Sequence, residues 1–159
     1  MSENLHGRHA IVTGGGSGIG EAIARTLSDA GARVTVMGRR LAPLESVASS
    51  LAGAQAIAVD VTDSASIKAA FARAGHADIL VNNAGHAESA PFERTDLALW
   101  NRMLSLNLTG AFLCTHEVLP RMRTTGWGRI VNIASIAAHK GHSYVTAYCA
   151  AKHGLLGFT

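Results

Sequence analysis

A tyrosine and a lysine lie four positions apart in the segment YCAAK, Tyr148 to Lys152, whose other residues are small. On a helix, positions i and i+4 share a face, so the lysine amine can lie beside the phenol ring. A nearby positive charge stabilises a phenolate, which suits the pair to proton transfer. Taken alone, the segment favours a simpler arrangement, in which the tyrosine packs at a helix end and the lysine extends into solvent. The rest of the chain decides between the two.

A glycine-rich turn offers a second kind of chemistry. The stretch TGGGSGIG, Thr13 to Gly20, has glycines that permit positive φ angles and close backbone approach. The N-terminus of a following helix supplies N–H donors and a partial positive charge, which suit a pyrophosphate. The glycines could form only a tight turn, but their place between an expected strand and helix favours a dinucleotide site. A Walker A loop is excluded because no Gly-Lys-Ser/Thr follows.

The second expected strand ends in VTVMGRR. A site that prefers NAD usually carries an acidic residue here, which binds the ribose 2′-hydroxyl. Gly38 stands near that place, and Arg39 and Arg40 could instead clamp a 2′-phosphate through charge-assisted hydrogen bonds. Solvated arginines at a helix start are the alternative. The sequence favours NADP(H), with NAD(H) as the second possibility.

The elements that must position these residues alternate along the chain. Short strands that are β-branched and apolar on both sides are typical of a parallel sheet covered by helices on both faces. The sequence predicts one α/β domain over residues 1–159, a doubly wound parallel sheet of the Rossmann type in strand order 3-2-1-4-5. Strands are expected at 9–13, 33–37, 54–60, 78–83 and 128–135, and helices at about 18–30, 41–51, 63–74 and 96–123.

The helix expected over 96–123 contains an unusual residue. Asp96 can cap its N-terminus, but Asn107 is a poor helix-interior residue because its amide competes with the backbone, and Gly110 weakens the same stretch. Either Asn107 is solvated, or the helix is locally distorted and directs the amide into a site. The apolar face is expected to comprise Leu97, Trp100, Leu104, Leu108, Ala111 and Phe112.

The chain ends at Thr159, where the 3-2-1-4-5-6 arrangement would continue into a sixth strand. An uncovered fifth strand at the edge of a parallel sheet is prone to aggregation. We therefore expect a fragment in which the later strands are missing.

Composition indicates a globular chain: 48% of the 159 residues are hydrophobic and 16% are charged. The formal net charge is +3 and the basic residues are mostly scattered, so neither nucleic acid nor metal is an expected partner. Cys114 and Cys149 lack metal or redox spacing, and no acidic or cysteine partner completes a ligand set beside any histidine pair. Without a signal peptide or a run of about 20 apolar residues, a cytoplasmic location away from membranes is expected.

Taken together, TGGGSGIG, Asp60, NNAG at Asn82 to Gly85, Asn107, Ser135 and YCAAK resemble the short-chain dehydrogenases/reductases. The TG-x3-G-x-G spacing is similar to the branch that reduces ketones and oxidises alcohols, such as the 3-oxoacyl carrier-protein reductases. The resemblance spans the whole chain, with the motifs in the family's order.

The resemblance implies a catalytic tetrad of Asn107, Ser135, Tyr148 and Lys152. Tyr148 would be the general acid in reduction and the general base in oxidation. Lys152 would favour the phenolate and bind the nicotinamide ribose. Ser135 would polarise the substrate carbonyl, and Asn107 would hold a water that links Lys152 to solvent.

The resemblance also implies the contacts with the dinucleotide. Asp60 would bind the adenine amino group with Val61 behind the ring, and Asn82 would lie against the adenosine ribose. The full expected set is Thr13, Gly14, Ser17, Gly18, Ile19, Gly20, Arg39, Arg40, Asp60, Val61, Asn82, Ala84, Gly85, Tyr148 and Lys152.

The substrate is left open as a small ketone or secondary alcohol. His139, Lys140 and His142 suit the anionic tail of an acyl-CoA or acyl-carrier-protein substrate, although a solvent-exposed loop explains them as well. In the family, the helices with Asn107 and Tyr148 pack against their mates, which implies a homodimer or homotetramer. The alternatives to an active enzyme are a dinucleotide-binding sensor and an inactive fragment.

Overall fold

Five parallel strands form one central sheet. The computed structural model describes residues 4–159, and the sheet order is β3-β2-β1-β4-β5 with every neighbouring pair parallel. This confirms the predicted doubly wound sheet and its 3-2-1-4-5 order. The strands are β1 (His9–Thr13), β2 (Arg33–Gly38), β3 (Gln55–Ala58), β4 (Ile79–Asn82) and β5 (Arg129–Asn132).

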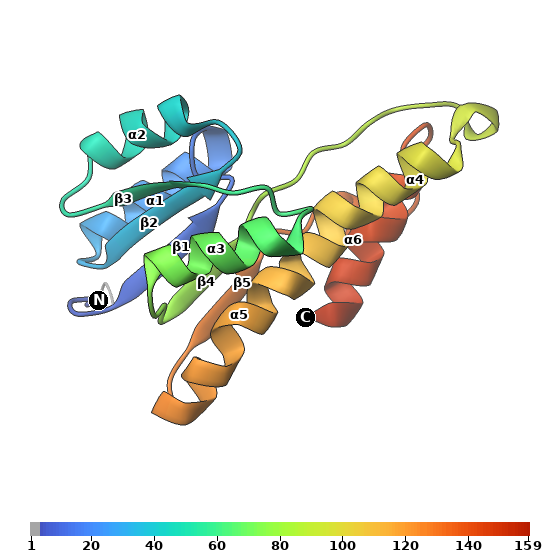
Figure 1. Cartoon of the computed structure of the whole chain (residues 1–159). Coiled ribbons are helices and arrows are strands. Elements are labelled where there is room, and N and C mark those ends of the chain that lie inside the picture. Colours follow the sequence, from blue (N-terminus) through green and yellow to red (C-terminus); the bar gives the residue numbers. More distant parts are fainter. Residues whose placement is uncertain (1–3) are drawn as a thin grey trace.

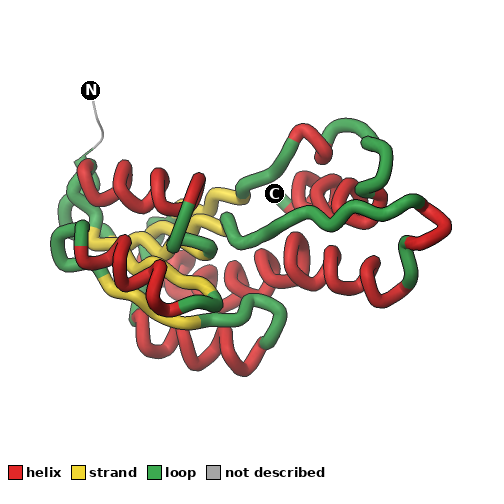
Figure 2. Tube along the Cα trace, turned by 90° about the horizontal axis from the view of Figure 1, so that it is seen from above, coloured by secondary structure: helices red, strands yellow, loops and turns green. Residues whose placement is uncertain are grey.

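Helices cover both faces of the sheet (Figure 1, Figure 2). Within residues 4–159, none of them is both long and apolar enough to cross a membrane. The α-helices are α1 (Gly18–Asp29), α2 (Leu41–Ser49), α3 (Ser64–Ala74), α4 (Leu97–Leu104), α5 (Gly110–Thr125) and α6 (Thr146–Phe158). Shorter turns are η1 (Phe92–Arg94) and η3 (Ile136–Ala138), which are 3-10 helical, and η2 (Ser105–Thr109), which is π-helical.

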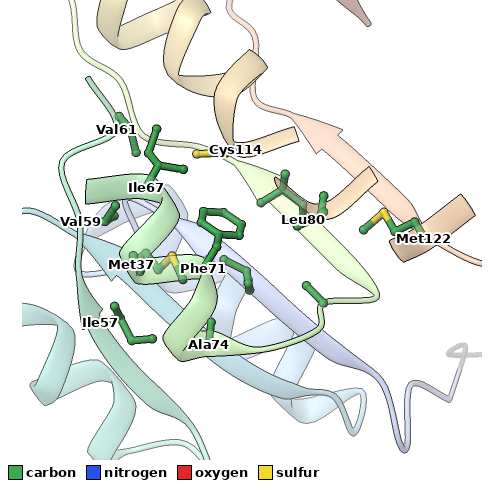
Figure 3. Packing of buried hydrophobic residues seen from close by; sticks show 14 residues of the cluster. Met37, Ile57, Val59, Val61, Ile67, Phe71, Ala74, Leu80, Cys114 and Met122 are labelled. Atoms are coloured by element: carbon green, nitrogen blue, oxygen red, sulfur yellow. The ribbon is translucent and has the colours of Figure 1, made fainter. Parts of the chain in front are cut away.

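Two hydrophobic clusters lie on opposite faces of the sheet, because alternate residues of a strand point to opposite sides. In β1, Ala10 and Val12 pack with residues of α1 and α2, whereas Ile11 packs with residues of α3 and α5. Figure 3 shows the second cluster, with Phe71 of α3 and Cys114 of α5 among its members. Burial raises the pKa of the Cys114 thiol to about 12, so this thiol stays protonated and has little nucleophilic character.

Three strands are shorter than predicted at their carboxyl ends, β4 by one residue and β3 and β5 by two and three. The strand expected over 54–60 ends at Ala58, and the one expected over 128–135 ends at Asn132. Asp60 and Ile133 lie just beyond these ends and line a cavity. The backbone therefore leaves the sheet where a site is built.

The long helix begins where predicted and is distorted in the middle. Asp96 caps α4 by accepting a hydrogen bond from the Leu99 amide at 2.7 Å. Between α4 and α5, the chain makes the π-helical turn η2, and Asn107 lies within it, only 2% exposed. The structure thus supports a local distortion around Asn107 rather than a solvated side chain.

The predicted apolar face of this helix is partly wrong. Leu97 is 71% exposed and Phe112 is 49% exposed. Ala111 is buried as predicted, together with four side chains that the sequence did not assign to this face: Met103, Cys114, Val118 and Met122. A π turn accommodates one more residue than an α turn, so it rotates the residues that follow it relative to those that precede it.

Helix α6, which carries Tyr148 and Lys152, lies beside α4 (Figure 1, Figure 2). Its small residues pack within the chain. Ala147 and Ala151 are buried, and a Cβ at Gly154 would lie 2.8 Å from Leu108 Cδ2. This close packing holds α6, which carries Tyr148 and Lys152, directly against η2, which carries Asn107.

Candidate active site

A cavity of about 1000 Å³ opens at the carboxyl ends of the strands. In open α/β sheets, ligands bind at this edge. Most of the expected cofactor contacts line the cavity, together with Ile133, Ala134 and residues of α4 that were not predicted. The predicted residues that line it are Gly14, Ser17, Ile19, Gly20, Arg39, Arg40, Asp60, Val61, Ala84, Gly85, Tyr148 and Lys152.

The glycine-rich turn requires glycine for two reasons: some positions have positive φ angles, and another has no room for a Cβ. Gly14 and Gly18 have φ angles of 67° and 56°, in the left-handed region that favours glycine. Gly20 is buried at the start of α1, where a Cβ would collide with the Gly14 carbonyl and the Asn83 side chain. The turn therefore brings bare backbone and the N-terminus of α1 to the cavity.

Thr13 holds this turn from behind rather than facing the cavity. It is buried, and its Oγ1 accepts hydrogen bonds from the backbone amides of Asn83 and Ala84 at 3.0 and 3.1 Å. Asn83 Nδ2 donates in return to the carbonyls of Thr13 and Gly14. Asn83 was not predicted individually, but it couples the end of β4 to the turn after β1.

Replacing Gly20 with alanine is expected to strain the turn, because the methyl group meets backbone that two hydrogen-bonded strands hold in place. Overpacking of this kind costs about 1–3 kcal/mol of unfolding free energy. Urea unfolding and a fluorescence titration with NADPH should both show the loss. Gly157→Ala is the control, because a Cβ there meets nothing within 4 Å. Equal stability of the two variants would contradict the prediction.

At the end of β3, Asp60 is fixed as a carboxylate. Its Oδ1 accepts hydrogen bonds from the Thr62 hydroxyl at 2.7 Å and from the Thr62 backbone amide at 2.9 Å. These bonds, with a smaller contribution from the charge of Arg39, hold the pKa of the Asp60 carboxyl below its usual range. Val61 is buried next to it, under Gly110 of α5. The pair offers an acceptor and an apolar wall side by side.

Arg39 and Arg40 are exposed at the cavity edge. Neither forms an ion pair with an acidic side chain in residues 4–159. Their guanidinium groups are therefore available to an anion at this end of the cavity.

Tyr148 and Lys152 share one face of α6, as the sequence predicts. Lys152 Nζ lies 5.7 Å from the centre of the Tyr148 ring and donates to the Ile133 carbonyl at 2.7 Å. The lysine is only 5% exposed, and burial lowers its pKa from the usual value. An ammonium has three donors, so two remain for other partners.

The side-chain oxygen of Asn107 lies close to Gly85, which is also close to the Lys152 ammonium. Its Nδ2 donates to the His86 and Met103 carbonyls at 3.0 and 3.1 Å, whereas its Oδ1 is buried with no partner. A Cβ at Gly85 would lie 2.6 Å from this Oδ1 and 3.8 Å from Lys152 Nζ. Because a buried acceptor without a donor is costly, Asn107 Oδ1 is a candidate acceptor for a hydrogen-bond donor close to Gly85 and Lys152.

Five predicted residues do not line the cavity: Thr13, Gly18, Asn82, Asn107 and Ser135. Gly18 lies in the turn, and Ser135 caps η3, its Oγ accepting from the Ala137 amide at 3.2 Å. Thr13 is buried as described. Asn82 is also buried, and its Nδ2 donates to Asn132 and Thr115 on β5 and α5. Of the two asparagines in NNAG, the first therefore joins the strands and the second holds the glycine turn.

The loop before α6 contributes less than the sequence suggested. His139 and Lys140 are exposed, and His142 is half-buried with its Nε2 unpartnered. None of the three lines the cavity. Within residues 4–159, no three His, Cys, Asp or Glu side chains converge as metal ligands.

Comparisons with known proteins agree on one family. The family model described as short chain dehydrogenase matches residues 8–159. D-threitol dehydrogenase of Mycolicibacterium smegmatis is 42% identical over 161 residues, covering 96% of this chain and 62% of the relative. A 3-oxoacyl-[acyl-carrier-protein] reductase of Aquifex aeolicus is 38% identical over 168 residues, covering 100% of this chain and 68% of the relative.

A solved structure described as a short chain dehydrogenase/reductase family protein superposes with a TM-score of 0.94 at 36% identity. It is matched over 98% of this chain and 67% of its own length. The chain thus spans between 62% and 68% of the length of these three proteins.

Proposed function

Since the chain belongs to the short-chain dehydrogenase family, we propose that it transfers a hydride between NADP(H) and a ketone or secondary alcohol. The observation that carries the proposal is the convergence of Tyr148, Lys152 and the unpartnered Asn107 Oδ1 at one end of the cavity. At the other end, the glycine turn and Asp60 provide a cradle of the size and polarity that a dinucleotide needs.

The cofactor would lie along the cavity, held by residues that follow several of the strands. Backbone amides at the start of α1 would bind the pyrophosphate, and Asp60 and Val61 would hold the adenine. Lys152, with two ammonium donors beyond the one given to Ile133, would bind the nicotinamide ribose. The nicotinamide C4 supplies or accepts the hydride when it is bound.

The chain's own residues would handle the proton. The Tyr148 phenol donates its proton to the carbonyl oxygen in reduction and takes it back in oxidation, and the Lys152 ammonium stabilises the phenolate between these events. Asn107 Oδ1 would accept from a water beside Gly85, which connects Lys152 to further protons. Ser135 would polarise the substrate oxygen after a local adjustment of its η3 cap.

We propose NADP(H) over NAD(H) because Arg39 and Arg40 stand at the end of β2 without acidic partners. Charge-assisted hydrogen bonds are worth about 1.5–3 kcal/mol, so Arg39→Ala should weaken NADPH binding roughly 10- to 100-fold and leave NADH binding nearly unchanged. Competitive titrations with both nucleotides measure this difference. Arg25→Ala removes the same charge from an ion pair with Glu21 outside the cavity, and it should change neither affinity. A wild-type preference for NADH would refute the assignment.

Hydride transfer is the decisive test. The chain is mixed with NADPH and a panel of ketones that includes a β-ketoacyl thioester, a keto polyol and a cyclic keto acid, and the loss of NADPH absorbance is followed. Reduction of any ketone that stops in Tyr148→Phe supports the proposal. Tight NADPH binding without turnover would indicate a dinucleotide sensor or an inactive fragment.

We also propose a homo-oligomeric assembly and a cytoplasmic location. Leu119 of α5 and Leu156 of α6 are exposed, as are Phe112 and Phe158, whose rings meet edge to face at 6.2 Å. Exposed apolar side chains on these two helices support a homodimer or homotetramer. The free, buried cysteines support the cytoplasm. The residues from 1 to 159 would serve as one dinucleotide-binding unit within this assembly.

A further inference from the structure

Three charged or polar side chains outside the expected tetrad form a network on the cavity wall. Arg102 donates through Nε and Nη2 to the two carboxylate oxygens of Glu88, at 3.3 and 2.9 Å. His86 Nε2 lies 3.4 Å from the same carboxylate. The hydrogen bonds from Arg102 hold the pKa of Glu88 below its usual range, so the carboxylate stays charged.

The network joins two parts of the chain that run side by side. Residues 83–96, here called the β4–α4 segment, leave the sheet after β4, run alongside α4 and then turn back to begin that helix (Figure 1, Figure 2). Glu88 belongs to this segment and Arg102 to α4. Further along the segment, the Ala90 amide donates to the Tyr144 carbonyl at 2.7 Å.

Tyr144 is the one non-glycine residue with positive φ, at 66°, in residues 4–159. A residue accepts this conformation only where its surroundings fix it. The β4–α4 segment is therefore held on both sides of Glu88, at Ala90 by the bond to Tyr144 and at His86 by the bond from Asn107.

The network lies next to the two backbone carbonyls that bind the Asn107 side chain. Its side-chain amide donates to the His86 carbonyl and to the Met103 carbonyl. His86 belongs to the network, and Met103 follows Arg102 on α4. The Arg102–Glu88 fork thus joins the segment that supplies the His86 carbonyl to the helix that supplies the Met103 carbonyl.

Global stability does not explain the network, because His86 and Arg102 are exposed and Glu88 is half-buried, and solvent-accessible ion pairs contribute little to folding. We infer that Glu88 and Arg102 are positioning residues, which fix the His86 and Met103 carbonyls and through them the Asn107 amide beside Lys152. The catalytic consequence of this inference rests on the proposed function, whereas the orientation of Asn107 does not.

The test uses Glu88→Gln, which keeps the shape of the side chain and removes its charge. The signals of the Asn107 side-chain amide are followed by nuclear magnetic resonance, and their exchange with solvent should accelerate by roughly threefold to tenfold. Turnover should fall by a similar factor with the NADPH dissociation constant unchanged. Arg102→Lys, which keeps the charge but not the fork, should lie between Glu88→Gln and the wild type.

Arg25→Lys is the matched control, because it breaks a similar fork onto Glu21 on α1 and should leave the Asn107 signals unchanged. In an Asn107→Ser background, Glu88→Gln should have no further effect on turnover. Unchanged Asn107 signals in Glu88→Gln would overturn the inference. A wild type without turnover would overturn the proposed function alone, because the amide signals still decide the positioning role.

Discussion

Tyr148→Phe is expected to lower turnover by roughly 10²- to 10⁴-fold, the range that a general acid–base group contributes. The substitution removes one hydroxyl and leaves the ring on the face of α6 that Lys152 shares. Under the proposed function, this hydroxyl is the group that supplies a proton to the carbonyl oxygen when the hydride arrives. The NADPH dissociation constant should stay within a factor of about two, because the main cofactor contacts lie elsewhere.

Tyr144→Phe is the matched control for this experiment, since it removes the same hydroxyl four positions earlier from a side chain that is 63% exposed. Steady-state rates of NADPH oxidation for the two variants should differ by at least about 100-fold. If both variants retain most of the wild-type rate, Tyr148 is not the proton donor.

Lys152→Met is expected to lower kcat/KM by at least roughly 100-fold, through two losses at once. The phenolate loses the neighbouring positive charge, and the nicotinamide ribose loses its ammonium donors. Unlike Tyr148→Phe, this variant should therefore also bind NADPH about tenfold more weakly. Lys68→Met, at an exposed position on α3, is the control and should change neither quantity.

The same lysine should leave a signature in the pH dependence of stability. Burial lowers the folded-state pKa of Lys152 below 10.5, so between the folded and unfolded pKa values the unfolded chain binds more protons. Stability therefore rises with pH through that window, and the cost of burying the charge is fully present below the folded pKa. Urea unfolding from neutral to alkaline pH should show a flatter profile for Lys152→Met than for the wild type. An identical profile would mean that Lys152 is not buried as a cation.

Periodicity and position predicted the scaffold well because both depend on local chemistry. The run HAIVT is strand β1 to the residue, since β-branched apolar residues suit a strand covered on both faces. The glycine turn and the Tyr148–Lys152 pair were also foreseen, because each is contained in one short segment. Asn107 was identified as a residue that a regular helix disfavours, and the structure has a π-helical turn at that position.

The sequence did not predict which way side chains point where the strands end. The two asparagines of NNAG look alike as letters, yet the pleat of β4 turns Asn82 toward α5 and β5, while Asn83 reaches the turn after β1. Thr13 was expected to meet the cofactor, and nothing in the sequence indicated that its side chain is buried and bonded to the backbone after β4. The Arg102–Glu88 ion pair joins residues 14 positions apart, and no periodic pattern in the sequence predicts that they meet.

The π turn at Ser105–Thr109 makes this stretch sensitive to changes in chain length rather than in residue type. In effect it is a one-residue insertion in an otherwise regular helix. Deleting a single residue there would restore an α-helical path and rotate α4 against α5 by about 100°. Asn107 would leave the space beside Gly85, and the faces now buried on the two helices would no longer align. Substitutions in η2 outside Asn107 and Leu108 should therefore be tolerated far better than single-residue deletions, which a deletion scan of residues 105–109 would show.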